Sequence, residues 1–200
     1  MNARLGEIVE ASTTRLRAVA PQTFEGPALG SFVKTSDGAR TTFCVVAHVE
    51  HVSIDPSRRA IPLGKIWDEL RREQPQVLEL LTTEFEAFCV AFADEDGTLC
   101  AYLPPVPPRV HDFVEACERE EIVELTADLS FIRTLGASGT PIVNELIAAA
   151  IRSAAVHHGD ERTYLIRAGR EVADLFRQDY ELASSIIRRI RVPQPQKARR

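Results

Sequence analysis

The sequence lacks the patterns that mark a membrane anchor, an export signal or a disulfide framework. No run of eighteen apolar residues occurs in its 200 residues, so we expect no transmembrane helix. The first dozen residues contain no apolar core of signal-peptide length, which favours a cytoplasmic protein. None of the cysteines forms a CxxC pair, and we expect reduced, mostly buried thiols at Cys44, Cys89, Cys100 and Cys117.

Signatures of catalysis are missing as well. Gly136-Ala-Ser-Gly139 lacks the lysine of a phosphate-binding loop, and neither GxSxG nor GxGxxG is present. His48 and His51 are three apart on a predicted strand and therefore on opposite faces, so they cannot bind one metal ion. His157 and His158 end a predicted helix, where a structural role is expected. The sequence therefore predicts no catalytic residue, no metal site and no cofactor.

The net charge of −5 hides an asymmetry between the body of the chain and its end. Residues 188–200 carry six basic side chains and no acid, which leaves 18 basic against 29 acidic residues, a charge of −11, in residues 1–187. An acidic body repels the phosphate backbone and disfavours a broad nucleic-acid-binding face. We expect residues 192–200 to form a basic, disordered tail.

A few arginines could still contact a partner or a phosphate group. For the loop arginines we expect ion pairs with acids of the same body, and a partner or phosphate contact is the alternative. The candidates are Arg58, Arg59, Arg188, Arg189 and Arg191.

Hydrophobic periodicity predicts an α+β protein with an N-terminal antiparallel barrel of about six strands over residues 1–103. Period-two patterns bounded by turn residues place the strands near 5–11, 14–19, 28–35, 41–52, 85–93 and 98–103. Residues 53–82 interrupt the pattern as a loop with short helices. The hairpin 85–103 is apolar on both faces and should be buried on both, with its second strand closing the barrel.

A proline-rich segment, residues 104–111, then predicts a stiff linker. Beyond it the period becomes helical, which predicts a helical domain over residues 112–191. Thr140 and Asp160 are expected to cap helices. The helix over 140–158 is apolar around most of its circumference, which is typical of a helix buried on several sides.

Three segments together resemble a known family, the HAS barrel of HerA-type DNA translocases and ATP synthases, in a free-standing bacterial form. They are Leu5-Gly-Glu-Ile-Val-Glu-Ala-Ser-Thr13, Pro27-Ala-Leu-Gly-Ser-Phe-Val33 and Val45-Val-Ala-His-Val-Glu50. In that family the barrel packs side by side into rings and, in the translocases, docks a nuclease. The resemblance implies a protein that has this assembly surface without the motor domain.

Three hypotheses follow for function. The first is a non-enzymatic assembly or adaptor protein that forms homo-oligomers or binds a protein partner, such as a HerA-type ATPase or its nuclease, without a membrane. The second is a nucleic-acid-binding protein that uses the basic loop and tail. The third is an enzyme whose site is built from residues remote in the sequence.

Overall fold

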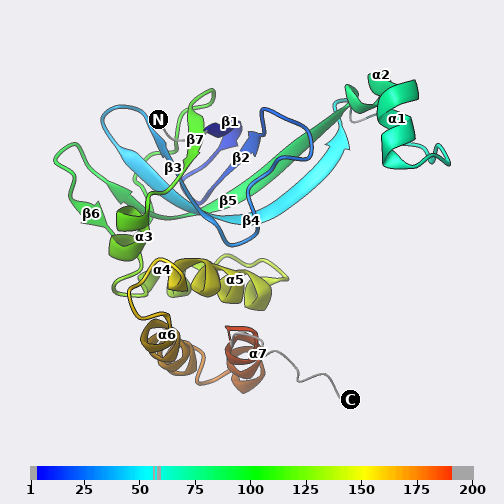
Figure 1. The fold of residues 1–200 in the computed structure, drawn as a ribbon. Helices are drawn as coiled ribbons and strands as arrows, with labels where there is room; N and C mark the ends of the chain where they lie inside the picture. The colour runs from blue at the N-terminus through cyan, green and yellow to red at the C-terminus, as the bar shows by residue number, and fades with distance from the viewer. Residues whose placement is uncertain (1–3, 56, 58–59, 191–200) are drawn as a thin grey trace, which may run out of the picture. The chain divides into compact units, whose positions relative to one another are not determined.

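A computed structural model describes residues 4–55, 57 and 60–190 (Figure 1). It confirms the α+β prediction, because the chain forms a closed six-stranded antiparallel barrel and a group of helices. The chain divides into two compact units, Met1–Cys117 and Glu118–Arg200. We refer to them as the barrel unit and the helical unit.

The barrel closes because β2 pairs with both β1 and β5, so the two ends of the strand order meet. The order is β2-β1-β7-β3-β4-β5, with β6 attached outside the ring to β5. The strands are β1 (Arg4–Ala11), β2 (Arg15–Val19), β3 (Phe32–Ser36), β4 (Thr41–Ser53), β5 (Leu81–Ala93), β6 (Leu99–Cys100) and β7 (Phe113–Ala116).

The strand that completes the ring differs from the one that the sequence predicts. The predicted closing strand 98–103 is reduced to the two residues of β6, which pair with β5. The ring is completed instead by β7, which lies between β1 and β3 through the pairs Phe113↔Glu7 and Ala116↔Val33. This strand has four residues with one buried side chain, Val114, too short to show a period.

The proline-rich segment does not separate the two units. Its end is held to the barrel, since His111 N–H donates to Ile8 O at 2.9 Å and Arg109 lies 3.6 Å from the Asp37 carboxylate. It leads into β7, so the predicted limits at 103 and 112 are replaced by a division between residues 117 and 118.

Irregular pairing between β4 and β5 decides which of their side chains enter the barrel. A strictly alternating β4 would put Phe43, Val45, Ala47 and Val49 on one face, but the pairing of β4 with β5 shifts register twice. The first shift passes over Val90 of β5 and the second passes over Ala47 of β4, so each strand reverses its alternation once. The buried core cluster therefore contains Ile8, Leu16, Ala18, Val33, Cys44, Val46, Phe85, Ala87, Cys89 and Val114.

The helical unit is built around one buried helix. Its described helices are α3 (Arg119–Leu125), α4 (Ser130–Gly136), α5 (Val143–Ala155), α6 (Glu161–Leu175) and α7 (Tyr180–Ile190). As its composition predicts, α5 buries side chains around most of its circumference, from Leu146 to Ile151 and again at Ala154 and Ala155. Asp160 caps α6 by accepting from Thr163 N–H at 3.0 Å, whereas α5 begins after the predicted cap at Thr140.

Candidate functional site

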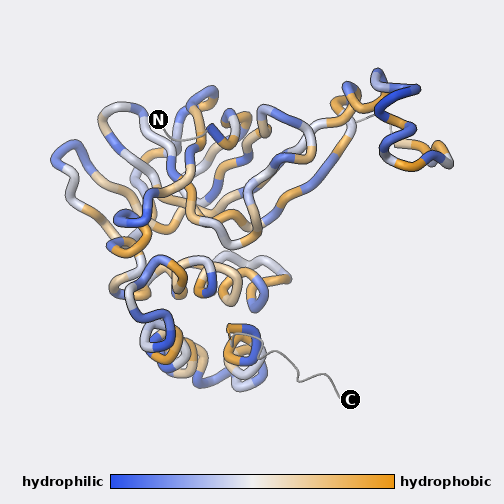
Figure 2. Tube along the Cα trace, viewed as in Figure 1, coloured by the Kyte–Doolittle hydropathy of each residue, from blue (hydrophilic) through white to orange (hydrophobic). Residues whose placement is uncertain are grey.

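The most distinctive feature of the barrel unit is a projection, which we call the arm (residues 49–83). It consists of the outer part of the β4–β5 hairpin and two short helices, α1 (Trp67–Glu73) and α2 (Pro75–Leu78) (Figure 1). Neither helix buries a residue. Apolar and hydrophilic stretches alternate along the arm in Figure 2. Its exposed large apolar side chains are Ile54, Ile61, Ile66, Trp67 and Leu80.

The arm is anchored to the barrel at one buried hydroxyl. Thr83, which is fully buried, accepts a hydrogen bond from Phe24 N–H at 2.6 Å and lies 2.9 Å from Nδ1 of His51. Phe24 has a φ of 71°, a left-handed conformation that is uncommon for a phenylalanine. Its ring makes edge contacts with His51 at 4.8 Å and with Trp67 at 4.9 Å. The base of the arm is thus a small aromatic cluster held by Thr83.

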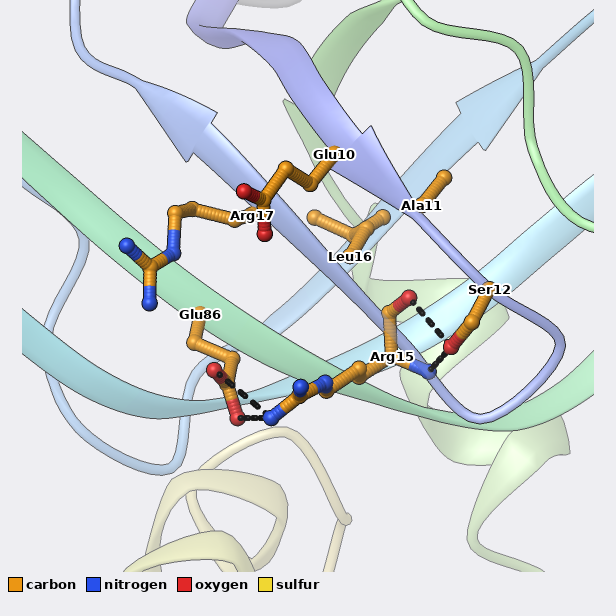
Figure 3. A pocket seen from close by; sticks show the side chains of 7 residues that line it. All are labelled: Glu10, Ala11, Ser12, Arg15, Leu16, Arg17 and Glu86. Atoms are coloured by element: carbon orange, nitrogen blue, oxygen red, sulfur yellow. Dashed lines mark hydrogen bonds and ion pairs between the residues drawn. The ribbon is translucent and has the colours of Figure 1, made fainter.

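A second candidate is a hollow of about 140 Å³ beside the β1–β2 turn (Figure 3). Glu10, Arg17 and Glu86 lie opposite one another on three adjacent strands, so acidic and basic residues alternate across the sheet. Arg15 pairs with Glu86 at 3.4 Å, an interaction drawn in Figure 3, and Arg17 pairs with Glu84 at 3.5 Å. Because both arginines already have acidic partners, the hollow is best explained as part of a set of cross-strand ion pairs that stabilises the outer face of the sheet.

The inside of the barrel holds a pair of thiols. Cys44 and Cys89 are directly opposed on β4 and β5, with their sulfurs 3.6 Å apart and no exposed surface. The hydrogen bond that the Cys44 thiol donates to the Cys89 sulfur, together with burial, raises the pKa of the Cys44 thiol well above its usual value. A protonated, buried thiol is a poor nucleophile, which agrees with the buried-thiol prediction. Cys100 instead is half-buried and lies outside the ring on β6.

A buried polar network joins three helices of the helical unit. Thr126, fully buried, donates to Ile122 O at 2.6 Å, so its oxygen is left to accept from Nε2–H of His158 at 2.9 Å. The His158 ring stacks on Tyr164 at 4.0 Å, and Arg167 lies 5.5 Å from the centre of the Tyr164 ring. Burial lowers the pKa of His158, with a contribution from the charge of Arg167, and burial raises the pKa of Tyr164 to about 12. The network joins the ends of α3 and α5 to α6. These contacts agree with the structural role that the sequence analysis expects for His158.

The structure describes only some of the arginines that the sequence suggests as contacts of a partner or a phosphate group. Arg58, Arg59 and Arg191 lie outside the described residues. Arg189 is committed to its own unit, since it pairs with Glu145 and donates to Ser185 Oγ at 2.6 Å. Arg188 is exposed, and its Nε donates to a carbonyl of its own helix. The structure therefore does not bring these arginines together as one site.

Arg188 instead borders an apolar hollow on the helical unit. The hollow lies between the end of α6 and α7 and has a volume of about 450 Å³. We call it the groove. Sequence reasoning missed both the groove and the exposure of Trp67, because each depends on which faces neighbouring elements leave uncovered.

The two histidines of β4 contact different partners, within the described residues 4–55, 57 and 60–190. His48 pairs with Glu50 at 3.7 Å while His51 faces Thr83, so the two histidines do lie apart. No group of three or more His, Cys, Asp or Glu side chains is arranged to hold a metal ion in these ranges. No helix in them is both long enough and apolar enough to span a bilayer.

Comparison with protein-family models and with curated protein sequences finds no match for this chain.

Proposed function

We propose that this chain is a non-catalytic assembly or adaptor protein in which the barrel carries the arm as the element that contacts another protein. The observation that carries the proposal is the exposure of large apolar side chains on a segment whose helices bury nothing. Ile66 is 65% exposed and Trp67 is 47% exposed. Clustered apolar side chains that stay in water on an isolated protein are typical of interaction sites, and tryptophan is enriched among residues that dominate binding.

The construction of the arm supports this role. Its two strands continue the β4–β5 ladder through pairs such as Val52↔Thr82, and its base is fixed to the barrel by the Thr83–Phe24 hydrogen bond. A contact element held on a rigid scaffold loses little conformational entropy on binding. The strained backbone of Phe24 fits the same interpretation, because such conformations persist where the surroundings impose them and cluster at functional positions.

The resemblance to the HAS barrel supports a choice of partner. By this resemblance, the arm would contact a further copy of this chain, a DNA-translocating ATPase or the nuclease of such an ATPase. This part of the proposal rests on analogy between barrels, since one fold serves several functions.

The proposal is tested by changing the arm and following what the protein binds. Tagged wild-type protein, the double variant Ile66→Ser, Trp67→Ser and the control Val156→Ser are purified from the native cell and their bound proteins quantified. Val156 is also an exposed apolar residue, at 62%, but lies in the helical unit after α5. We expect recovery of a defined partner, or of untagged copies, to fall at least about tenfold in the arm variant, the usual scale of an interface hot spot. Equal recovery from all three proteins would contradict the proposal.

A further inference from the structure

The groove on the helical unit combines an apolar floor with a basic rim. Apolar surface is supplied by Ala173, Phe176, Ile187 and the ring of Tyr180, which is 80% exposed, and the rim carries Arg177 and Arg188. Its volume of about 450 Å³ falls within the range of sites that bind small ligands or inserted side chains. The groove is therefore large enough for an indole ring together with a neighbouring aliphatic side chain.

The two arginines define the charge of the occupant. Among the described residues, Arg177 and Arg188 form no ion pair, and Arg188 donates to Ser184 O at 3.3 Å. A guanidinium group with free donors binds carboxylates in preference to other side chains. The groove thus fits a segment that carries apolar side chains next to acidic ones.

The arm contains such a segment, Ile66-Trp67-Asp68-Glu69. Its first two side chains are exposed, and within the described ranges Asp68 and Glu69 form no ion pair. Two of the nearby cations are already engaged, because Lys65 binds Glu73 at 2.9 Å and Arg72 binds the same carboxylate at 3.3 Å.

The segment that directly follows α7 in the sequence has the wrong charge to occupy the groove. Residues 191–200 carry four basic side chains, Arg191, Lys197, Arg199 and Arg200, and no acid. Like charges placed together oppose binding, so Arg177 and Arg188 disfavour this tail as the occupant.

We infer that the groove binds residues 66–69 of a second copy of this chain, with Trp67 and Ile66 on the apolar floor and Asp68 and Glu69 at the two arginines. The inference rests on the proposed role of the arm as a contact element and adds its receptor. The contact joins two different surfaces, so a pair of copies is left with one free arm and one free groove, and assembly continues or closes into a ring.

Charge reversal tests the contact in both directions. One variant carries Arg177→Glu and Arg188→Glu, and the other carries Asp68→Lys and Glu69→Lys. Both are compared with wild type by sedimentation velocity over a concentration series up to tens of micromolar, after circular dichroism has established equal folding. Emission from Trp67 is recorded in parallel, because it is the one tryptophan of the chain.

We expect wild type to self-associate with a shift of Trp67 emission to shorter wavelength, and each reversed variant to associate at least about tenfold more weakly because like charges then face each other. An equimolar mixture of the two variants should regain association, since the reversed groove matches the reversed arm.

The inference would be overturned by wild type that stays monomeric or by a mixture that regains no association. A shift of Trp67 emission that does not depend on protein concentration would overturn it as well. Loss of association in the arm variant alone would refute the groove as receptor and leave the arm as contact element. Loss in the groove variant alone would show that the groove binds something other than the arm of a second copy, which would overturn the inference.

Discussion

The placement of β1 against Phe85 can be tested with a single methyl group. Gly6 is buried in β1, and a Cβ atom there would lie 2.7 Å from Cε1 of Phe85 and 2.9 Å from the carbonyl oxygen of Val19. Carbon atoms pack best at about 3.5–4.0 Å. Neither neighbour can withdraw easily, because Phe85 is 1% exposed and Val19 belongs to the paired strand β2. Gly6→Ala should therefore overpack the barrel.

The magnitude follows from two opposing effects. Overpacking a core costs about 2–3 kcal/mol of folding free energy, within the usual range, and the loss of glycine freedom in the unfolded chain offsets about 0.5–1 kcal/mol of it. We expect Gly6→Ala to lower the free energy of unfolding of the barrel unit by about 1–2 kcal/mol. In urea this corresponds to a midpoint lower by about 0.5–1.5 M.

A second substitution separates this cause from others. Phe85→Leu removes the ring atoms that the new methyl group would meet but leaves its contact with the Val19 carbonyl, so Gly6→Ala should cost less in the Phe85→Leu background than in wild type. Urea unfolding of the four proteins, followed by circular dichroism, gives the coupling free energy between the two positions, which we expect to be at least about 0.5 kcal/mol. A neutral Gly6→Ala, or additive effects, would refute the packing of Phe85 beneath β1.

Three further predictions concern the helical unit. Gly169→Ala should raise its free energy of unfolding by about 0.5–1 kcal/mol in urea titration, because the added Cβ lies 3.5 Å from Ile190 Cδ1 within a helix; a loss of stability would contradict this packing. Thr126→Val should lower that free energy by about 1–3 kcal/mol in thermal melts, since His158 loses its buried partner while the Ile122 carbonyl keeps the backbone N–H of residue 126; an unchanged melting temperature would count against the network. Tyr164 should ionise near pH 12 in absorbance titrations, and Tyr164→Phe should remove that step. Because folding raises the pKa of Tyr164, the contribution of this residue to stability is complete below about pH 10 and is lost as the pH rises toward 12.

Much of the barrel could be predicted from local patterns. Alternating apolar residues and turns such as Asp37-Gly38 indicate the strands, and Asp160 marks the start of α6 through its capping hydrogen bond. These signals depend on neighbours in the sequence. The sequence therefore predicts the α+β class and the places where strands run.

Features that depend on distant partners could not be predicted. Strand β7 is too short to show a period and exists because β1 and β3 leave a gap that it pairs with, through contacts such as Phe113↔Glu7. The register shifts between β4 and β5, at Val90 and at Ala47, set Cys44 opposite Cys89, a pairing that alternation alone does not predict. Sequence patterns likewise could not show that Trp67 is left exposed or that Arg188 borders an apolar groove.

The central claim, that the arm contacts another protein, is tested most directly by photo-crosslinking from the arm itself. A photoreactive benzophenone side chain is placed at Trp67 and, as a control, at Val156, and the native cells that produce each protein are irradiated. Our account predicts a discrete crosslinked product from position 67, either a second copy or a defined partner protein, and little from position 156. The absence of crosslinks at position 67, or the same products from both positions, would contradict it.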